Sequence, residues 1–149
     1  MAQEHFYQVA VQFETERKGT LSSEKLTETL EVATPPEFPK GMENIWSPEH
    51  YFVAAVNSCL MTTFLAIAEN FKLPFVDFKS DATGTLSVVD GKYMMSKIVL
   101  RPTIVVENEE HRALAQKVIE KSEKACLITN SIKSDVLMEV HVVVSQPVI

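Results

Sequence analysis

The sequence predicts an α+β fold with the element order β-β-β-α-β-β-α-β and a long buried central helix. Three observations lead to this prediction. Short alternating segments fill the first 33 residues, an uncharged stretch runs from Tyr51 to Ala68, and Asp90-Gly91 divides a long β-rich region. The order lacks the regular βα alternation of a doubly wound sheet. Because the 149 residues are 46% hydrophobic, we expect one core and a single domain over 1–149.

The first three strands are expected to form a meander. Apolar residues alternate with polar ones between Tyr7 and Phe13, which is the period of a half-buried strand. Two further strands are expected at 17–21 and 26–33. Three prolines and a glycine between 34 and 47 then predict a loop.

The central helix is expected to begin at Ser47-Pro48 and to end near Phe71. Serine is a good N-cap because its side chain accepts a hydrogen bond from an otherwise unpaired amide. Proline suits the first helical position because it has no amide to leave unpaired. Pro74 lies beyond the expected end of the helix.

This helix is apolar on nearly every face, which is typical of a buried central helix. One sheet system and one other helix cannot cover every face, so we expect an obligate homodimer in which a second copy completes the cover. The stretch from His50 to Asn70 is long enough for a membrane span. However, four polar residues between 57 and 63 interrupt it and no Lys/Arg asymmetry orients it, so we expect no membrane insertion.

The second half of the chain is expected to contain a hairpin, a helix and a last strand. The hairpin covers 75–106, with the Asp-Gly pair as its turn. Asn108 is a good cap for a helix over 109–125, which has an apolar face. After a loop at 129–131, a final strand is expected from Val136 to Val144.

Composition and charge exclude several classes of function. The net charge of −6 and the scattered positions of the 14 Lys and Arg residues argue against nucleic-acid binding. The four histidines show no metal-ligand spacing, and no phosphate loop, nucleotide fingerprint or serine nucleophile elbow is present. We therefore expect no metal and no cofactor. The N-terminal segment lacks the features of a signal peptide, which favours a cytoplasmic location.

The only two cysteines, Cys59 and Cys126, are the first candidates for chemistry. In a reducing compartment a disulfide is more often catalytic than structural. The alternative is that Cys59 is an inert core thiol, because an apolar helix raises a thiol pKa. A reactive Cys59 therefore needs a partner from elsewhere in the fold. Arg17 and Glu49 are the candidates, although Arg17 can equally be a solvated surface residue and Glu49 an acid that complements the helix dipole.

The order of these residues resembles the OsmC/Ohr family, over about residues 7–144. The resemblance rests on Arg17-x-Gly19 in an early strand, Ser47-Pro48-Glu49 opening a helix, Cys59 ten residues later, and Cys126 closing a later helix. The segments 47–60 and 125–131 carry most of its specificity. Many relatives have proline directly after the second cysteine, whereas this chain has Leu127.

The resemblance implies an intertwined homodimer that acts as a thiol-dependent peroxidase on hydroperoxides, organic ones in particular. Cys59 would be the peroxide-reducing thiol, passing through a sulfenic acid, and Cys126 the resolving thiol that forms a disulfide with it. Arg17 and Glu49 would complete the site. Some family members are recycled by dihydrolipoyl groups on partner proteins, so a thiol reductant of that kind is an expected partner.

The chemistry suggests a role for each group. A cationic Arg17 would stabilise the thiolate and contact the peroxide, and Glu49 would hold the guanidinium in a two-pronged pair. In a regular helix, ten residues place Glu49 and Cys59 about 15 Å apart along the axis and about 80° apart around it. We therefore predict a composite site, in which Arg17 and Glu49 of one chain serve Cys59 of the other.

Four apolar residues near the central helix are candidates for a pocket that takes a bulky organic peroxide, with ordinary core packing as the alternative. They are Phe38, Ile45, Trp46 and Phe52. A non-catalytic dimeric module that binds an apolar small molecule, with inert cysteines, is the alternative function.

Overall fold

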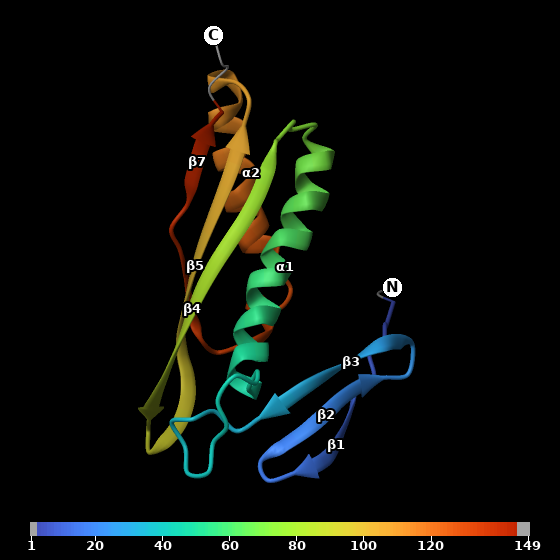
Figure 1. Ribbon diagram of the computed structural model, residues 1–149. Helices are drawn as coiled ribbons and strands as arrows, with labels where there is room; N and C mark the ends of the chain where they lie inside the picture. Colours follow the sequence, from blue (N-terminus) through green and yellow to red (C-terminus); the bar gives the residue numbers. More distant parts are fainter. Residues whose placement is uncertain (1–2, 146–149) are drawn as a thin grey trace. The chain divides into compact units, whose positions relative to one another are not determined.

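The computed structural model describes residues 3–145 (Figure 1). The chain divides into two compact units, one that ends at Tyr51 and one that begins at Phe52. Each unit is described by itself. The observed order of strands and helices agrees with the predicted α+β class.

The first unit contains a three-stranded antiparallel sheet in the order β1-β2-β3, as predicted. The strands are β1 (Ala10–Thr15), β2 (Lys18–Ser23) and β3 (Leu26–Ala33). Gly19 is buried in β2, and a Cβ atom there would lie 2.8 Å from the backbone oxygen of Gln12. Glycine at this position therefore allows the close approach of β1 and β2.

One face of this sheet is apolar and uncovered in the single chain. Val11 pairs with Leu21, which in turn pairs with Leu30, so the three side chains form a row across the sheet. Val11 is 67% exposed and Phe13 is 68% exposed, so the prediction of a half-buried first strand is wrong for the single chain. The reason is that the described part of this unit has no second layer of its own to pack on the sheet.

The loop after β3 leads directly into the central helix, α1 (Pro48–Asn70). The Ala33 amide donates to the Trp46 carbonyl at 3.0 Å, which closes the loop just before the helix. Ser47 is fully buried, and its Oγ accepts a hydrogen bond from the His50 amide at 3.2 Å. The predicted loop and the predicted helix start are confirmed.

The second unit contains a sheet built around β5. The order is β4-β5-β6, and a further strand, β7, also pairs with β5. The β4–β5 pair is antiparallel, whereas β6 and β7 are parallel to β5. The bounds are β4 (Asp77–Val89), β5 (Lys92–Val106), β6 (Asp135–Met138) and β7 (His141–Val144).

The predicted hairpin turn is confirmed by its backbone conformation. Asp90 has a φ of 50° and Gly91 a φ of 78°, as a type I′ turn requires at both central positions. This turn joins β4 to β5, whose residues pair from Asp77 with Val105 to Val89 with Lys92.

The last strand is split in two, which corrects the prediction of one strand from Val136 to Val144. Leu100 pairs with Met138 and Thr103 with His141, so the gap between β6 and β7 lies opposite Arg101 and Pro102. Proline has no amide to donate to a neighbouring strand. The interruption on the last strand therefore follows from a proline on β5.

The second helix begins three residues later than predicted and ends at Ala125 as predicted. A 3₁₀ turn, η1 (Glu109–His111), precedes α2 (Arg112–Ala125), and a second 3₁₀ turn, η2 (Thr129–Ser131), stands where a loop was expected. Asn108 caps η1 by position, but its side chain makes no cap hydrogen bond. The His111 amide instead donates to the Asn108 carbonyl at 3.0 Å, which is the local 3₁₀ pattern.

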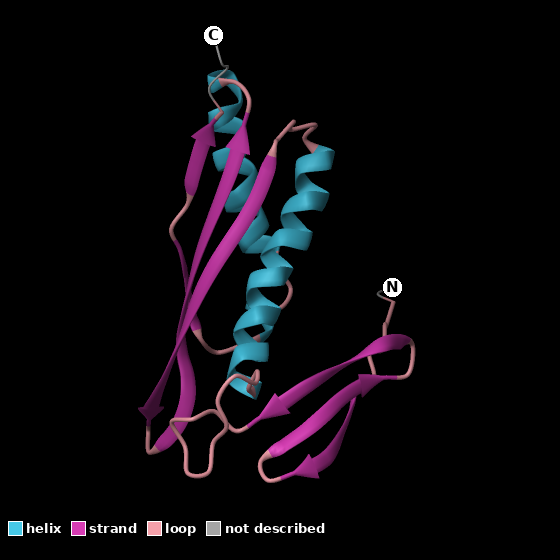
Figure 2. Cartoon of the chain, viewed as in Figure 1, coloured by secondary structure: helices cyan, strands magenta, loops and turns pink. Residues whose placement is uncertain are grey.

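The core of the second unit lies between one face of the sheet and the two helices (Figure 2). Its β5 residues are spaced by two or four positions and therefore share one face. The core consists of Val56, Leu60, Phe64, Ala68, Leu73, Ile98, Leu100, Ile104, Val106, Ala115, Val118 and Ile119.

Helix α1 buries one face in the single chain, whereas the prediction of cover on every face required a second copy. Met61 is 38% exposed and Leu65 is 42% exposed in the single chain. By length and composition alone, α1 is apolar enough to cross a membrane. Leu60 and Phe64 of α1 nevertheless pack in the core of the second unit.

Candidate functional site

The structure brings the two cysteines into contact. Cys59 lies on the buried face of α1 and is 9% exposed, and Cys126 follows the last residue of α2 and is 1% exposed. Both are free thiols, and each is a hydrogen-bond partner of the other. Two residues far apart in the sequence thus meet at the junction of the two helices.

The environment of Cys59 lowers its pKa. Burial by itself raises the pKa, because it disfavours the charged form. Hydrogen bonds from the Ile128 amide, the Cys126 thiol, the Thr63 hydroxyl and the Leu127 amide outweigh burial, because they stabilise the thiolate. Cys59 therefore has more thiolate character at neutral pH than an ordinary cysteine.

The environment of Cys126 raises its pKa. Burial is the main cause, and the neighbouring Cys59 adds to it as a hydrogen-bond partner and a negative charge. The side chain and amide of Thr129 act in the opposite direction but do not outweigh the burial. When the pair loses one proton, Cys59 is therefore the residue that carries the negative charge, and Cys126 keeps its proton.

The turn after Cys126 directs these donors. Cys126 leaves the helical conformation at φ −65° and ψ 111°, and its carbonyl accepts the Asn130 amide at 3.0 Å. The Ser131 hydroxyl donates to the Leu127 carbonyl at 2.7 Å, which closes the turn on itself. The amides of Leu127 and Ile128 then face the sulfur of Cys59 rather than a carbonyl of the turn.

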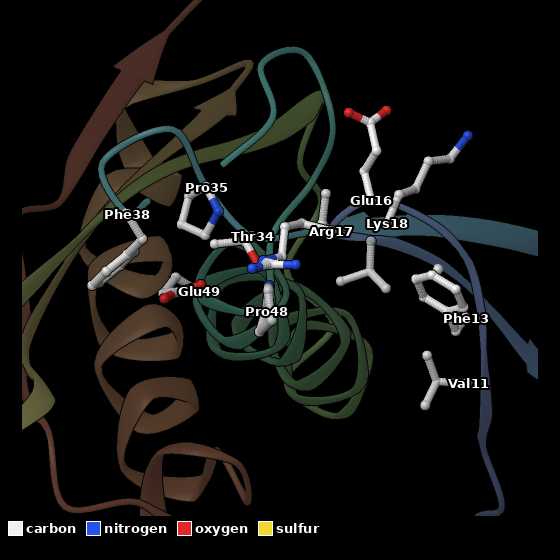
Figure 3. A pocket seen from close by; sticks show the side chains of 13 residues that line it. Val11, Phe13, Glu16, Arg17, Lys18, Thr34, Pro35, Phe38, Pro48 and Glu49 are labelled. Atoms are coloured by element: carbon white, nitrogen blue, oxygen red, sulfur yellow. The ribbon is translucent and has the colours of Figure 1, made fainter. Parts of the chain in front are cut away.

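Arg17 and Glu49 line a pocket of about 790 Å³ in the first unit (Figure 3). Arg17 lies in the turn between β1 and β2 and not in a strand as predicted, and its carbonyl accepts the Thr34 amide at 3.2 Å. Glu49 lies in the first turn of α1. In Figure 3 the side chains of Glu16 and Lys18 extend away from the other lining residues.

The predicted two-pronged ion pair between Arg17 and Glu49 is not formed in the single chain. Among residues 3–145, the ion pairs of the first unit join Lys18 to Glu14 and to Glu31. The Oε1 atom of Glu49 is buried and has no hydrogen-bond partner there. A buried carboxylate oxygen without a donor is costly, so Glu49 is an acceptor whose partner is still missing.

The pocket is mainly apolar, although its walls differ from those predicted. Phe38 lines it, as predicted, whereas Ile45, Trp46 and Phe52 are not among the lining residues. Trp46 is 54% exposed and packs against the rings of His50 and Tyr51. The apolar lining residues are Val11, Phe13, Val32, Ala33, Pro35, Phe38 and Pro48.

Sequence reasoning missed the groups that contact the two sulfurs. Thr63 stands four residues after Cys59 on one helix, so its position on the same face was readable from the sequence. Thr129 and the backbone amides of Leu127 and Ile128 reach the sulfurs through the turn after α2. Backbone amides carry no sequence signature, so these donors appear only in the structure.

Comparison with known proteins agrees with the resemblance found in the sequence. The family described as OsmC-like protein matches residues 41–141. An uncharacterised protein of Bacillus subtilis, YmaD, is 27% identical over 146 residues, which is 95% of each chain.

Solved structures show the same fold. An OsmC-like protein of unknown function from Vibrio cholerae, VCA0330, is 25% identical and has a TM-score of 0.82 over 92% of this chain and 99% of its own. An organic hydroperoxide resistance protein from Elizabethkingia anophelis is 18% identical, with a TM-score of 0.76 over 97% and 100% of the two chains. The predicted fold class is thereby confirmed.

Proposed function

The chain belongs to the OsmC-like protein family. We propose that it is a thiol-dependent peroxidase that reduces organic hydroperoxides to alcohols. The observation that carries the proposal is the contact between Cys59 and Cys126, with the pKa of Cys59 lowered and that of Cys126 raised. A thiolate that attacks and a protonated thiol beside it are the two groups that this chemistry needs. Relatives of the same fold include proteins named for organic hydroperoxide resistance.

The reaction proceeds in two steps within this pair. The Cys59 thiolate attacks one peroxide oxygen, the O–O bond breaks, and the leaving alkoxide takes a proton to become the alcohol. Cys59 is then a sulfenic acid. The Cys126 sulfur attacks the Cys59 sulfur and displaces water, so that a disulfide forms and two electrons have passed to the peroxide. A thiol reductant of the dihydrolipoyl class restores both thiols by exchange.

Arg17 and Glu49 have a separate role in this proposal, namely to hold the peroxide. The guanidinium of Arg17 is a donor to the peroxide oxygens, and the unpartnered Glu49 oxygen is the acceptor that orients the guanidinium. The apolar lining around them, which includes Phe38, suits the organic part of the substrate.

The site is proposed to be complete only in a homodimer. Glu49 and Cys59 are ten residues apart on the continuous helix α1, so one chain's Glu49 is about 15 Å along the axis from its own Cys59. The row of Val11, Leu21 and Leu30 gives the first unit an uncovered apolar face that a second copy would bury.

The second candidate is a non-catalytic module that binds an apolar small molecule. The observation in its favour is the apolar pocket itself, together with the burial of both thiols. The two candidates differ in the fate of the thiols, because a binding module keeps both thiols after exposure to peroxide.

A free-thiol count separates the two candidates. The reduced protein is counted before and after one equivalent of cumene hydroperoxide, and Cys59→Ser and Cys126→Ser are treated in the same way. A peroxidase loses both thiols, Cys59→Ser keeps its remaining thiol, and Cys126→Ser loses its thiol to the sulfenic acid. If the wild-type protein keeps both thiols, the peroxidase function is rejected and the binding module is retained.

A further inference from the structure

The hydroxyl group of Thr63 lies next to the reacting sulfur. Its Oγ1 is 3.9 Å from the Sγ of Cys59, and the two residues are one helical turn apart on α1. We propose that Thr63 is a catalytic residue whose hydroxyl donates to the Cys59 thiolate and holds the negative charge on that sulfur. This inference deepens the proposed peroxidase function and rests on it.

Neighbouring hydroxyl groups on the same helix behave differently. The Oγ of Ser58 donates to the Ala54 carbonyl at 2.7 Å, and the Oγ1 of Thr62 donates to the Cys59 carbonyl at 3.1 Å. Both follow the common habit of helical Ser and Thr side chains, which bond the backbone of the preceding turn. Thr63 instead has a side-chain sulfur as its partner, so its hydroxyl contacts the atom that is proposed to attack the peroxide.

The remaining donors approach the Cys59 sulfur from another element. They are the amides of Leu127 and Ile128 and the thiol of Cys126, all in the turn that follows α2. Cys126 is the one titratable group among them, and none of these donors is a charged side chain. Neutral hydrogen-bond donors can stabilise a thiolate without a cation, and Thr63 is the one that α1 itself supplies.

A matched pair of variants tests the role of the hydroxyl. Thr63→Val removes the hydroxyl beside the sulfur and keeps the shape of the side chain. Thr62→Val makes the same change one residue earlier, where the hydroxyl contacts the backbone. Thr63→Ser keeps the hydroxyl and serves as the rescue variant, which also controls for any loss of folding in Thr63→Val.

The readout is the rate at which iodoacetamide alkylates Cys59 in the reduced full-length protein, followed by peptide mass spectrometry between about pH 5 and 10, a range that brackets ordinary thiol ionisation. Mass spectrometry separates Cys59 from Cys126. We expect Thr63→Val to move the midpoint of the Cys59 alkylation profile to higher pH. Alkylation at neutral pH should become slower by about threefold to tenfold, which is the effect of losing one hydrogen bond. Thr62→Val and Thr63→Ser are expected to stay within about twofold of wild type, because each keeps a donor on the sulfur.

The proposal is overturned if Thr63→Val titrates like the wild type, or if Thr62→Val shifts the profile equally. Alkylation requires no peroxide, so the test stands apart from the proposed function. The alkylation profile can depend on Thr63 in a protein that does not react with cumene hydroperoxide. That result would support the role of Thr63 at the thiolate and would reject only the peroxidase activity.

Discussion

Residue 127 acts on Cys59 through its backbone rather than its side chain. The Leu127 side chain is 65% exposed, whereas its amide donates to the Cys59 sulfur. Proline, the residue that the resemblance to the family leads us to expect at this position, has no amide to donate. Leucine at 127 therefore gives this chain one more donor to the thiolate.

Replacing Leu127 with proline should raise the pKa of Cys59. We expect Leu127→Pro to slow Cys59 alkylation at neutral pH by about twofold to threefold, since the Leu127 amide contributes least among the donors that lower the pKa of Cys59. The pH profile of alkylation measures the shift. Leu127→Ala keeps the amide and is the control, so an equal effect of both variants would show that the side chain is responsible.

Residues with reactive side chains could be predicted from the sequence, whereas the backbone amides that contact their sulfurs could not. Cys59 and Cys126 were identified as a pair, and the structure places them in contact. Arg17 and Glu49 were predicted to form an ion pair, but in the single chain they only share a pocket. The ion pair depends on side-chain positions that a local pattern does not determine.

Ser47 and Asn108, the two residues predicted as caps, differ in their hydrogen bonding. Ser47 is buried and exchanges hydrogen bonds with His50, because its Oγ accepts the His50 amide and lies 2.7 Å from the ring Nδ1. Asn108 makes no such bond from its side chain. Two residues with similar cap signals in the sequence should therefore contribute differently to the free energy of unfolding.

A pair of alanine substitutions tests this difference. Ser47→Ala should lower the free energy of unfolding by about 1 kcal/mol, the usual cost of losing an N-cap. Asn108→Ala should lower it by less than about 0.5 kcal/mol, because no cap hydrogen bond is lost. Urea denaturation measures both values. Equal losses would contradict the assignment of Ser47 as the functional cap.

Elements with local signals were predicted well, and elements shaped by a distant partner were not. The Asp90-Gly91 turn and the start of α1 are determined by residues at those positions, and both predictions are confirmed. The break between β6 and β7 depends on Pro102 of β5, which lies opposite the gap. No sequence pattern within 136–144 predicts this break.

The apolar face of the first sheet should be buried when two copies assemble. We expect the wild-type protein to have twice the chain mass of 16.7 kDa in light scattering. Leu30→Glu places a charge on the apolar face and should shift the protein towards the monomer. Thr29→Glu adds the same charge on the opposite face of β3 and should remain a dimer. A dimeric Leu30→Glu variant would exclude this face from the interface.

The composite site predicts that two inactive variants restore each other. Arg17→Ala keeps Cys59, and Cys59→Ser keeps Arg17, so a mixed dimer contains one intact site if the residues come from different chains. Random mixing makes half of the dimers mixed, so peroxidase activity should recover to about a quarter of wild type. Refolding the two variants together and measuring peroxide consumption tests this. No recovery would place Arg17 and Cys59 of one chain in the same site.

Peptide mass spectrometry after peroxide treatment tests the proposed pairing of Cys59 with Cys126. The reduced protein is treated with one equivalent of cumene hydroperoxide, digested without reductant and searched for cross-linked peptides. We expect a Cys59–Cys126 disulfide within one chain, so that the oxidised protein runs as a monomer on a non-reducing denaturing gel. Two unmodified thiols, or an over-oxidised Cys59 beside a free Cys126, would contradict it.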